Sequence, residues 1–296
     1  MFKEINLFSL AKRINRPLIL DGAMGSLLQQ RGFKPDGPMW MSLLNLKNQE
    51  VIYKIHKEYI SAGADIITAN TFRTNPAAVK NYSKINIRKI VKESVNTAFE
   101  AAKSFPVLVA GSNAPAEDCY QAQRTLSNKV IKINHYTHIN LLMENGCHFV
   151  LNETQSHFDE IKIISSYCYK NEIPYVVSLF FDKDLKLLSG ENLSETIEFI
   201  LDKNPLAIGF NCIIPAVFRK AIKKIFPLLK DFNWGFYLNC GEGSYSDELI
   251  LCSIMPEDYS KIAVRDLSKN PSFIGACCGS SPRHISELRK IINAKI

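Results

Sequence analysis

The chain has 296 residues, 46% of them hydrophobic, and its 36 basic and 29 acidic residues give a formal net charge of +7. This composition is typical of a globular protein with a sizeable core. We expect no membrane partner, because no apolar run approaches the roughly 18 to 20 residues that span a bilayer. We expect no nucleic-acid partner either, because the lysines lie scattered at helical spacing and not in basic runs interleaved with aromatic residues.

Short apolar and β-branched segments alternate with longer segments of helical period along the whole chain. Strands are predicted at residues 18–20, 65–69, 107–110, 149–151, 175–180, 207–210, 235–238 and 273–276. Helices are predicted between them at residues 49–62, 85–104, 129–145, 158–170, 194–203 and 216–229. A last helix, at 282–292, follows the final strand, with Ser281 as its N-cap and a proline at its first position.

Eight alternating strand and helix units predict parallel strands joined by right-handed crossovers, and eight is the number that closes a (β/α)8 TIM barrel. An open doubly wound sheet is the alternative, and it requires a glycine-rich phosphate loop after the first strand. The segment Asp21-Gly22-Ala23-Met24-Gly25 does not fit the G-x-G-x-x-G pattern of such loops. Because no linker divides the sequence, we predict one barrel domain over residues 1–296.

The N-terminus and the cysteines together indicate a cytoplasmic protein. Residues 1–6 carry an acid early and do not lead into a signal-peptide apolar region. Eight cysteines in a chain of this length do not suggest a disulfide scaffold. Five are dispersed and are interpreted as small buried hydrophobes or idle thiols: Cys119, Cys147, Cys168, Cys240 and Cys252. The adjacent pair Cys277-Cys278 differs, because two neighbouring thiols in a reducing compartment need a reason.

Polar residues follow most of the predicted strands, and in a closed barrel these strand ends share the rim where catalytic groups collect. They are Asp21, Asn70-Thr71, Ser112-Asn113, Asn152-Glu153-Thr154, Asn211-Cys212, Asn239 and Cys277-Cys278. A turn-forming role explains any single Asn or Asp. It explains poorly an Asp, a Glu and two thiol positions on one rim.

The cysteines on this rim suggest a metal site. Cys212 meets the Cys277-Cys278 pair if strands six and eight flank strand seven. Successive strand residues point to opposite faces, so both members of the pair face one metal only where the strand breaks, and Gly275 and Gly279 bracket the pair and permit that break. Three thiolates with one open position form a catalytic zinc arrangement, and their softness favours zinc over magnesium or calcium. On spacing alone, two buried cysteines and a third by chance remain the alternative.

Motifs spread over the whole chain resemble those of the homocysteine S-methyltransferase family, in the same order. They are Leu20-Asp21-Gly22-Ala23-Met24-Gly25, Ala62-Gly63-Ala64-Asp65, Asn70-Thr71-Phe72, Glu153-Thr154, Gly209-Phe210-Asn211-Cys212 and Gly275-Ala276-Cys277-Cys278-Gly279. The resemblance implies a (β/α)8 barrel that holds zinc with Cys212, Cys277 and Cys278. It also implies that Asp21 and Glu153 help to hold the amino group of homocysteine.

A further segment bears on the methyl donor. Residues 237–242 resemble the Asn-x-Gly-Glu stretch of free-standing family members that use sulfonium donors, in which the Asn, here Asn239, can occupy the open zinc position when substrate is absent. The resemblance then implies methyl transfer from S-methylmethionine or S-adenosylmethionine to the homocysteine thiolate, giving methionine.

Two other functions stay open. Many family members have Gly-Pro after the third strand, whereas this chain has an unusual loop from Gly111 to Tyr120. That loop leaves room for a betaine-dependent or a methylfolate- or corrinoid-dependent enzyme. A non-catalytic zinc-binding protein on the same barrel is the third possibility, and the presence of Asp21 and Glu153 argues against it, because a metal store needs no amino-acid pocket.

Overall fold

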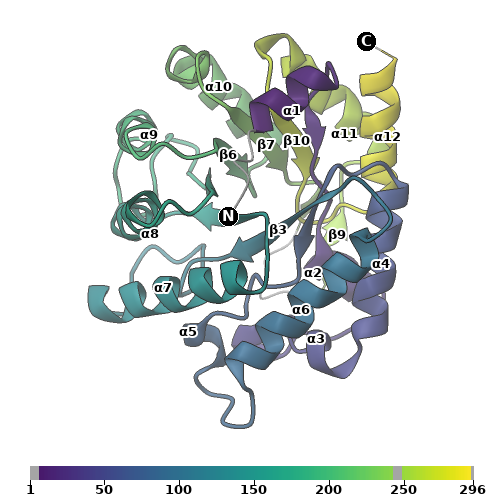
Figure 1. The fold of residues 1–296 in the computed structure, drawn as a ribbon. Coiled ribbons are helices and arrows are strands. Elements are labelled where there is room, and N and C mark those ends of the chain that lie inside the picture. Colours follow the sequence, from purple (N-terminus) through teal and green to yellow (C-terminus); the bar gives the residue numbers. More distant parts are fainter. Residues whose placement is uncertain (1–6, 243–248, 295–296) are drawn as a thin grey trace.

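The computed structural model describes residues 7–242 and 249–294, and within them eight parallel strands form a nearly closed barrel surrounded by helices (Figure 1). The barrel strands are β1 (Leu18–Ile19), β2 (Ile66–Ala69), β3 (Leu108–Asn113), β4 (Phe149–Gln155), β5 (Tyr175–Leu179), β6 (Ala207–Asn211), β7 (Trp234–Leu238) and β10 (Phe273–Ala276). They pair in the order β1-β10-β7-β6-β5-β4-β3-β2, and a parallel bridge from Leu20 to Ile66 joins the two ends. This confirms the predicted barrel.

The helices follow the strands as the sequence predicts. They are α1 (Leu7–Arg13), α2 (Met24–Gln30), α3 (Leu44–Lys47), α4 (Gln49–Ser61), α5 (Pro76–Val79), α6 (Ile87–Ala102), α7 (Asn128–Glu144), α8 (Phe158–Lys170), α9 (Leu193–Leu201), α10 (Pro215–Leu229), α11 (Pro256–Ala263) and α12 (Pro282–Asn293), with short 3₁₀ turns η1 (Gly37–Met39) and η2 (Val264–Lys269). All seven predicted helices are confirmed. The helices absent from the prediction have at most eight residues, too few to show a helical period, and the antiparallel ribbon of β8 (Gly241–Glu242) and β9 (Leu251–Cys252) was also not predicted.

Alternation along the strands divides the apolar side chains between two cores. Ile66 and Phe149 belong to the cluster that fills the barrel interior, whereas their neighbours Ile67 and Val150 pack with the helices outside. Ala11 of α1 joins the interior cluster and covers the amino-terminal end of the barrel. Because the interior is filled and that end is covered, the opposite rim is left for a site.

The motif Ala62-Gly63-Ala64-Asp65 serves barrel closure, not chemistry. The Asp65 carboxylate pairs with Arg16 at 2.6 Å and with Arg289 at 2.9 Å, and it accepts the Ile19 N–H at 2.8 Å. Gly63 has φ of +104°, and a Cβ there would lie 2.7 Å from Arg289 Nε. Helix α12, strand β1 and strand β2 are therefore fastened together at the amino-terminal end of the barrel.

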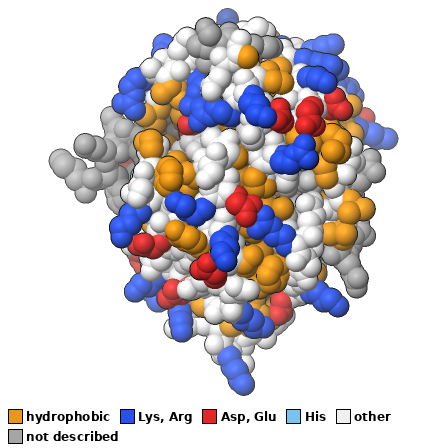
Figure 2. Space-filling view, turned by 90° about the vertical axis from the view of Figure 1, so that its right-hand side faces the viewer, with side chains coloured by type: hydrophobic (Ala, Val, Ile, Leu, Met, Phe, Trp, Pro, Cys, Tyr) orange, Lys and Arg blue, Asp and Glu red, His pale blue; other side chains and the backbone are white. Residues whose placement is uncertain are grey.

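The outer surface over α4 and α12 mixes charges of both signs. Figure 2 shows lysines and arginines interspersed with acids and apolar side chains on this face, which is the right-hand side of Figure 1. Arg31 pairs with Glu58 across α2 and α4, and Lys290 pairs with Glu287 within α12. In the part of the chain that the structure describes, no helix combines the length and the apolar character needed to cross a bilayer.

Candidate metal and substrate site

The carboxyl ends of the barrel strands surround a cavity of about 620 Å³. All six side chains that the sequence singles out line this cavity: Asp21, Glu153, Cys212, Asn239, Cys277 and Cys278. They come from the ends of β1, β4, β6, β7 and β10, so the fold brings together residues more than 250 positions apart in the sequence.

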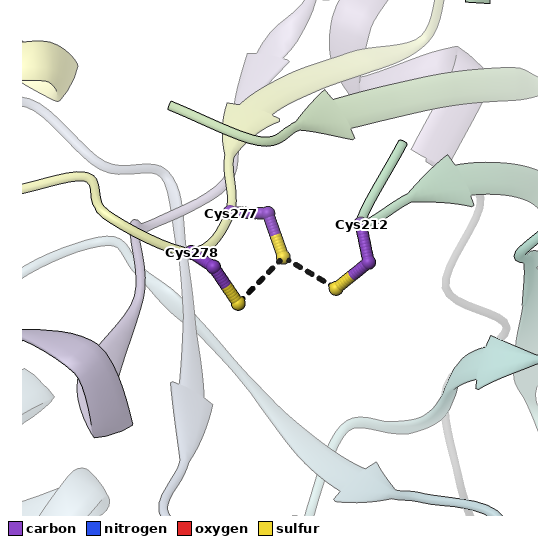
Figure 3. Close-up of side chains that lie close together, drawn as sticks. All are labelled: Cys212, Cys277 and Cys278. Atoms are coloured by element: carbon purple, nitrogen blue, oxygen red, sulfur yellow. Dashed lines mark hydrogen bonds between the residues drawn. The ribbon is translucent and has the colours of Figure 1, made fainter. Parts of the chain in front are cut away.

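The three cysteines lie side by side in this cavity, with their side chains pointing toward one another (Figure 3). The Sγ atoms of Cys212 and Cys277 are 2.9 Å apart, those of Cys277 and Cys278 are 4.0 Å apart, and all three lie within 4.8 Å of one another. A tetrahedral ion with Zn–S distances of about 2.3 Å separates its sulfur ligands by about 3.8 Å. The observed separations bracket that value, so small side-chain adjustments suffice to hold one ion.

Strand alternation by itself turns only one of the three cysteines into the cavity. Phe273 faces the barrel interior, and so Cys277, four residues on, faces the same side. In β6, Ile208 and Phe210 pack with the outer helices, which would send Cys212 outward too. Cys212 instead adopts φ of 56°, a left-handed conformation that is uncommon for a non-glycine residue, and this reverses the direction of its side chain.

Cys278 reaches the cavity because the chain turns immediately after β10. The Ser280 N–H donates to the Cys277 carbonyl at 3.1 Å and closes the turn. Gly279 has φ of +81°, and a Cβ there would lie 2.3 Å from Gly241 Cα. Only glycine meets both conditions. Gly275 does not help to break the strand, as the sequence had suggested, because it lies within β10. Its lack of a side chain makes room for Leu20, since a Cβ added at Gly275 would lie 2.9 Å from the Cβ of Leu20.

Ionisation of one thiol in this cluster opposes ionisation of the other two. Hydrogen bonds from Cys277 and Cys278 hold the pKa of the Cys212 thiol well below its ordinary value. Hydrogen bonding to Cys212 in turn raises the pKa of Cys277 and of Cys278. The cluster therefore accepts one negative charge readily and resists a second, which is the behaviour of a thiol set that becomes fully ionised only when it binds a positive ion.

Two carboxyl groups face the same cavity without a basic partner. Asp21 accepts the Thr68 N–H at 2.8 Å and the Thr68 hydroxyl at 3.0 Å, and Ser112 donates to Glu153. Neither acid forms an ion pair in residues 7–242 or 249–294. Burial raises the pKa of Asp21 well above its ordinary value, with repulsion from Glu153 adding to the effect, and burial raises the pKa of Glu153 to about 7.

Two polar atoms beside the cysteines and the carboxyls are unsatisfied in the described residues. Asn239 donates to the Cys212 carbonyl at 3.2 Å, while its own side-chain oxygen is buried and accepts no hydrogen bond. The Tyr237 hydroxyl, buried near Glu153, also has no partner in ordinary hydrogen-bond geometry. Buried polar atoms of this kind are costly unless a ligand completes them.

Two cavity residues, Trp40 and Arg73, were not foreseen from the sequence. Trp40 packs edge-on against Phe72, with ring centroids 6.3 Å apart, and Gly25 lacks a Cβ because Trp40 fills that space. Arg73 follows β2, and Tyr120 belongs to the loop after β3 that the sequence analysis had singled out. The signal for Arg73 was its place directly after the Asn70-Thr71-Phe72 motif.

The other five cysteines take no part in this cluster. Cys147 and Cys168 are buried with the helices, and burial raises the pKa of each thiol. Cys119 and Cys240 are also buried, and Cys252 is exposed. Among the residues that the structure describes, Cys212, Cys277 and Cys278 form the one group of three or more side chains placed to share a metal ion.

Known proteins share both the sequence and the fold. Homocysteine S-methyltransferase 1 of Arabidopsis thaliana is 24% identical over an alignment that covers 97% of each chain. Homocysteine S-methyltransferase YbgG of Bacillus subtilis is 25% identical, with 92% of this chain and 93% of that protein covered. The metallated form of the homocysteine methyltransferase MmuM from Escherichia coli has the same fold, with a TM-score of 0.81 at 22% identity over 97% of this chain and 100% of the other.

The family comparison covers nearly the whole barrel. The model of the homocysteine S-methyltransferase family matches residues 18–292, from the first residue of β1 into the last turn of α12. The match therefore includes every strand end that lines the cavity. This chain belongs to the homocysteine S-methyltransferase family and is an enzyme of that class.

Proposed function

We propose that this chain transfers a methyl group from a sulfonium donor, S-methylmethionine or S-adenosylmethionine, to the thiolate of L-homocysteine, giving methionine. Zinc held by Cys212, Cys277 and Cys278 is the proposed cofactor, and residues 1–296 act as one homocysteine-binding domain. The observation that carries this proposal is the meeting of three sulfur atoms and two unpaired carboxyl groups on one cavity.

The donor set fits zinc. Three sulfur ligands suit a soft or borderline ion, whereas magnesium and calcium prefer oxygen. Three protein ligands also leave one tetrahedral position for a substrate, as catalytic zinc sites do. When bound, zinc would supply the positive charge that keeps a fourth thiol, that of homocysteine, ionised near neutral pH.

The residues of the chain would orient homocysteine. Asp21 and Glu153 face the cavity as acids without basic partners, so an ammonium group is the ligand that relieves their mutual repulsion. The unsatisfied oxygen of Asn239 lies on the same cavity. It would occupy the fourth zinc position in the absence of substrate and leave that position when the homocysteine sulfur binds. The thiolate sulfur then forms a bond to the methyl carbon as the bond from that carbon to the donor sulfonium breaks, and a neutral thioether leaves.

Charge favours a cationic donor. Three protein thiolates and a substrate thiolate around a divalent ion carry a formal charge of −2. A sulfonium is attracted to such a site and loses its charge as the methyl group moves. Trp40, Phe72 and Tyr237 line the cavity and offer aromatic faces to a cation. Phe210, near the end of β6, is buried in the outer core and does not line the cavity.

One assay separates the donors. Purified enzyme is incubated with homocysteine and, in turn, S-methylmethionine, S-adenosylmethionine, betaine or a methylated folate or corrinoid, and methionine is measured by mass spectrometry. We expect methionine from S-methylmethionine and slower formation from S-adenosylmethionine. Turnover with betaine alone, or only with a methylated folate or corrinoid, would refute the sulfonium proposal.

The non-catalytic alternative needs a separate measurement. A zinc-binding protein on a retired barrel predicts no specific heat when homocysteine is titrated into the zinc-loaded chain. We expect saturable binding of one homocysteine per chain by isothermal titration calorimetry. A variant with both Asp21→Asn and Glu153→Gln is the control, and it should keep zinc while binding homocysteine more weakly.

A further inference from the structure

Arg73 places a guanidinium group on the wall of the substrate cavity. It follows β2 directly, beside Phe72, and its central carbon lies 5.4 Å from the Phe72 ring centroid. One nitrogen, Nη1, donates to the carbonyl oxygens of Glu117 at 2.7 Å and Pro115 at 3.4 Å. The other two nitrogens, Nη2 and Nε, have no acceptor among the described residues.

Arg73 also lacks a counter-ion. No acidic side chain lies within 4 Å of it in the described residues, whereas the nearby Arg124 pairs with both Asp159 and Glu160. The candidate acids are occupied or distant. Glu117 accepts the Thr125 and Leu126 N–H groups, and Asp118, which lines the same cavity, accepts the Tyr120 N–H.

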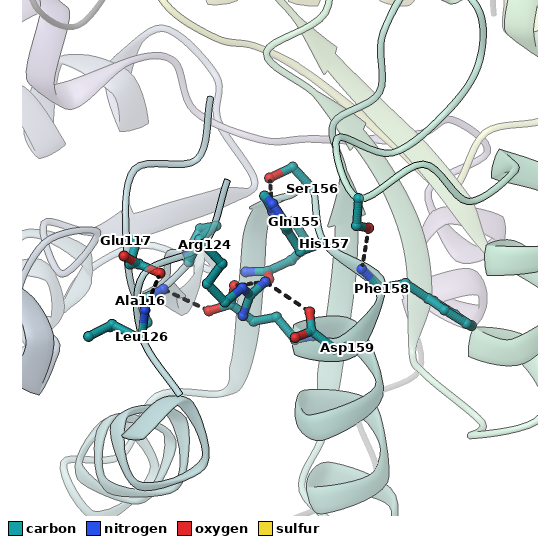
Figure 4. A network of polar contacts seen from close by, with 12 residues as sticks. Ala116, Glu117, Arg124, Leu126, Gln155, Ser156, His157, Phe158 and Asp159 are labelled. Carbon is teal, nitrogen blue, oxygen red and sulfur yellow. Dashed lines mark hydrogen bonds and ion pairs between the residues drawn. The ribbon is translucent and has the colours of Figure 1, made fainter. Parts of the chain in front are cut away.

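The loop whose carbonyls bind Arg73 is itself held by hydrogen bonds to α8 and to the end of β4. Residues 114–127, the β3–α7 loop, lie against the first turn of α8 (Figure 4). Glu160 accepts the Ala116 N–H at 2.7 Å and contacts His135 at 2.5 Å, and its other oxygen lies 3.2 Å from Arg124. Ser156 donates to the Cys119 carbonyl at 2.8 Å. The carbonyls that bind Arg73 are therefore fixed, and the guanidinium is held in place before any ligand binds.

The cavity otherwise repels anions. Apart from Arg73, its charged groups are the acids Asp21, Glu117, Asp118 and Glu153 and the exposed Lys80, and its other ionisable groups are four cysteines (Cys119, Cys212, Cys277 and Cys278) and two tyrosines (Tyr120 and Tyr237). A substrate carboxylate entering this cavity needs a positive group, and a guanidinium with two free N–H directions suits a carboxylate. Asp21 follows β1 and Glu153 lies in β4, the strands that flank β2 and β3, and both are assigned to the amino group of homocysteine. Arg73 follows β2 and is held by carbonyls of the β3–α7 loop.

We propose that Arg73 binds the carboxylate of the amino-acid methyl donor and so selects donors that carry one. This inference rests on the proposed function and adds a specificity residue to it. The sulfonium end of such a donor points toward the cysteines, while its carboxylate is held at the wall between β2 and the β3–α7 loop.

The test pairs one substitution with one substrate truncation. S-methylmethionine is compared with its decarboxylated analogue, (3-aminopropyl)dimethylsulfonium, in the wild-type enzyme and in Arg73→Gln. A charge-assisted pair predicts that the wild type prefers S-methylmethionine by about 10- to 100-fold in kcat/KM. In Arg73→Gln that preference should fall to within about threefold, with turnover of the truncated donor nearly unchanged. Arg73→Lys keeps the positive charge but lacks the planar guanidinium that can donate two parallel hydrogen bonds to a carboxylate, so it should give an intermediate preference.

Two controls separate binding from architecture. Zinc content and thermal unfolding show whether Arg73→Gln keeps its fold, and a purely structural role would lower turnover of both donors equally. Lys80→Gln removes a charge from the edge of the same cavity and should leave the preference intact. Loss of the preference in Lys80→Gln would overturn the assignment to Arg73.

A second truncated substrate shows which carboxylate Arg73 binds. With 3-aminopropane-1-thiol in place of homocysteine, Arg73→Gln should still reduce the use of S-methylmethionine. If the effect of the substitution vanishes with this thiol, Arg73 binds the carboxylate of homocysteine and the inference is wrong. An unchanged donor preference in Arg73→Gln refutes this inference alone, whereas absence of wild-type turnover with S-methylmethionine refutes the proposed function as well.

Discussion

The sulfur half of the rim (Cys212, Cys277 and Cys278) and the carboxylate half (Asp21 and Glu153) present their side chains by different means. In the sulfur half, Cys212 is reversed by a left-handed φ of 56°, and Cys278 depends on the turn at Gly279. In the carboxylate half, Glu153 lies within β4 and continues the inward-facing set of Phe149 and Leu151.

The two halves also differ in what holds their side chains in place. Asp21 and Glu153 are held by hydrogen bonds from neighbouring strands, through Thr68 and Ser112. The sulfur atoms contact one another at 2.9 and 4.0 Å, and among the described residues only Cys212 Sγ also accepts hydrogen bonds from the strand residues Asn211 at 3.4 Å and Thr154 at 3.7 Å. Both carboxyl groups are therefore held by neighbouring strands, whereas Cys212 and Cys278 depend on local backbone turns, and zinc completes the sulfur half in the function proposed above.

Removal of any one sulfur tests this contrast most severely. We expect bound zinc to fall from about one per chain to near zero in each of the variants Cys212→Ala, Cys277→Ala and Cys278→Ala. Each variant keeps only two protein thiolates, whereas catalytic zinc sites have three protein ligands. Methionine formation should fall to background with the loss of zinc. Metal analysis of the purified variants measures the first effect, and full zinc in Cys212→Ala would refute the assignment. Cys168→Ala is the control and should keep its zinc, because Cys168 is a buried residue of α8 outside the cluster.

The turn that aims Cys278 is expected to be nearly as sensitive. Gly279→Ala forces a Cβ against Gly241 and adds about 1 to 2 kcal/mol for the left-handed backbone. Zinc affinity should fall strongly although all three cysteines remain. Gly32→Ala is the matched control, because Gly32 has φ of +87° and nothing within 4 Å of the added Cβ. Competition with a chelator compares the two variants, and equal zinc affinities would contradict the role given to the turn.

The carboxylate half should respond more mildly and without losing metal. Glu153→Gln removes one charge-assisted contact to the homocysteine ammonium, which predicts binding weaker by roughly 10- to 100-fold at unchanged zinc content. Calorimetric titration with homocysteine measures it, and Glu172→Gln, at a surface turn after α8, is a control that should bind as the wild type does.

The role of Glu153 also predicts how the affinity for homocysteine changes with pH. With a pKa of about 7, Glu153 is protonated below that pH and ionised above it, so the wild type should bind homocysteine progressively more weakly as pH falls below 7. Ionisation of the homocysteine thiol adds a similar trend to both proteins. The part due to Glu153 is the difference between wild type and Glu153→Gln, and identical pH profiles would contradict it.

Much of this protein follows from local sequence. Short apolar, β-branched runs and segments of helical period predicted all eight barrel strands and seven helices, with α8 predicted at the same residues that the structure shows. Local patterns suffice for these elements because each strand is buried on both faces and each long helix is amphipathic. The motifs at the strand ends likewise predicted Asp21, Glu153, Asn239 and the cysteines as neighbours on one rim.

Tertiary structure decided the rest. Alternation along β6 would have turned Cys212 away from the cavity, and only the backbone conformation adopted in the folded barrel reverses it. The role of Gly279 depends on Gly241, and that of Gly25 on Trp40, contacts between segments that no local pattern joins. The exposure of Arg73 to the cavity likewise depends on the β3–α7 loop offering it carbonyl groups and no carboxylate. The physical reason is the same in each case: these properties depend on which atoms lie across the cavity, and barrel closure alone brings those atoms together.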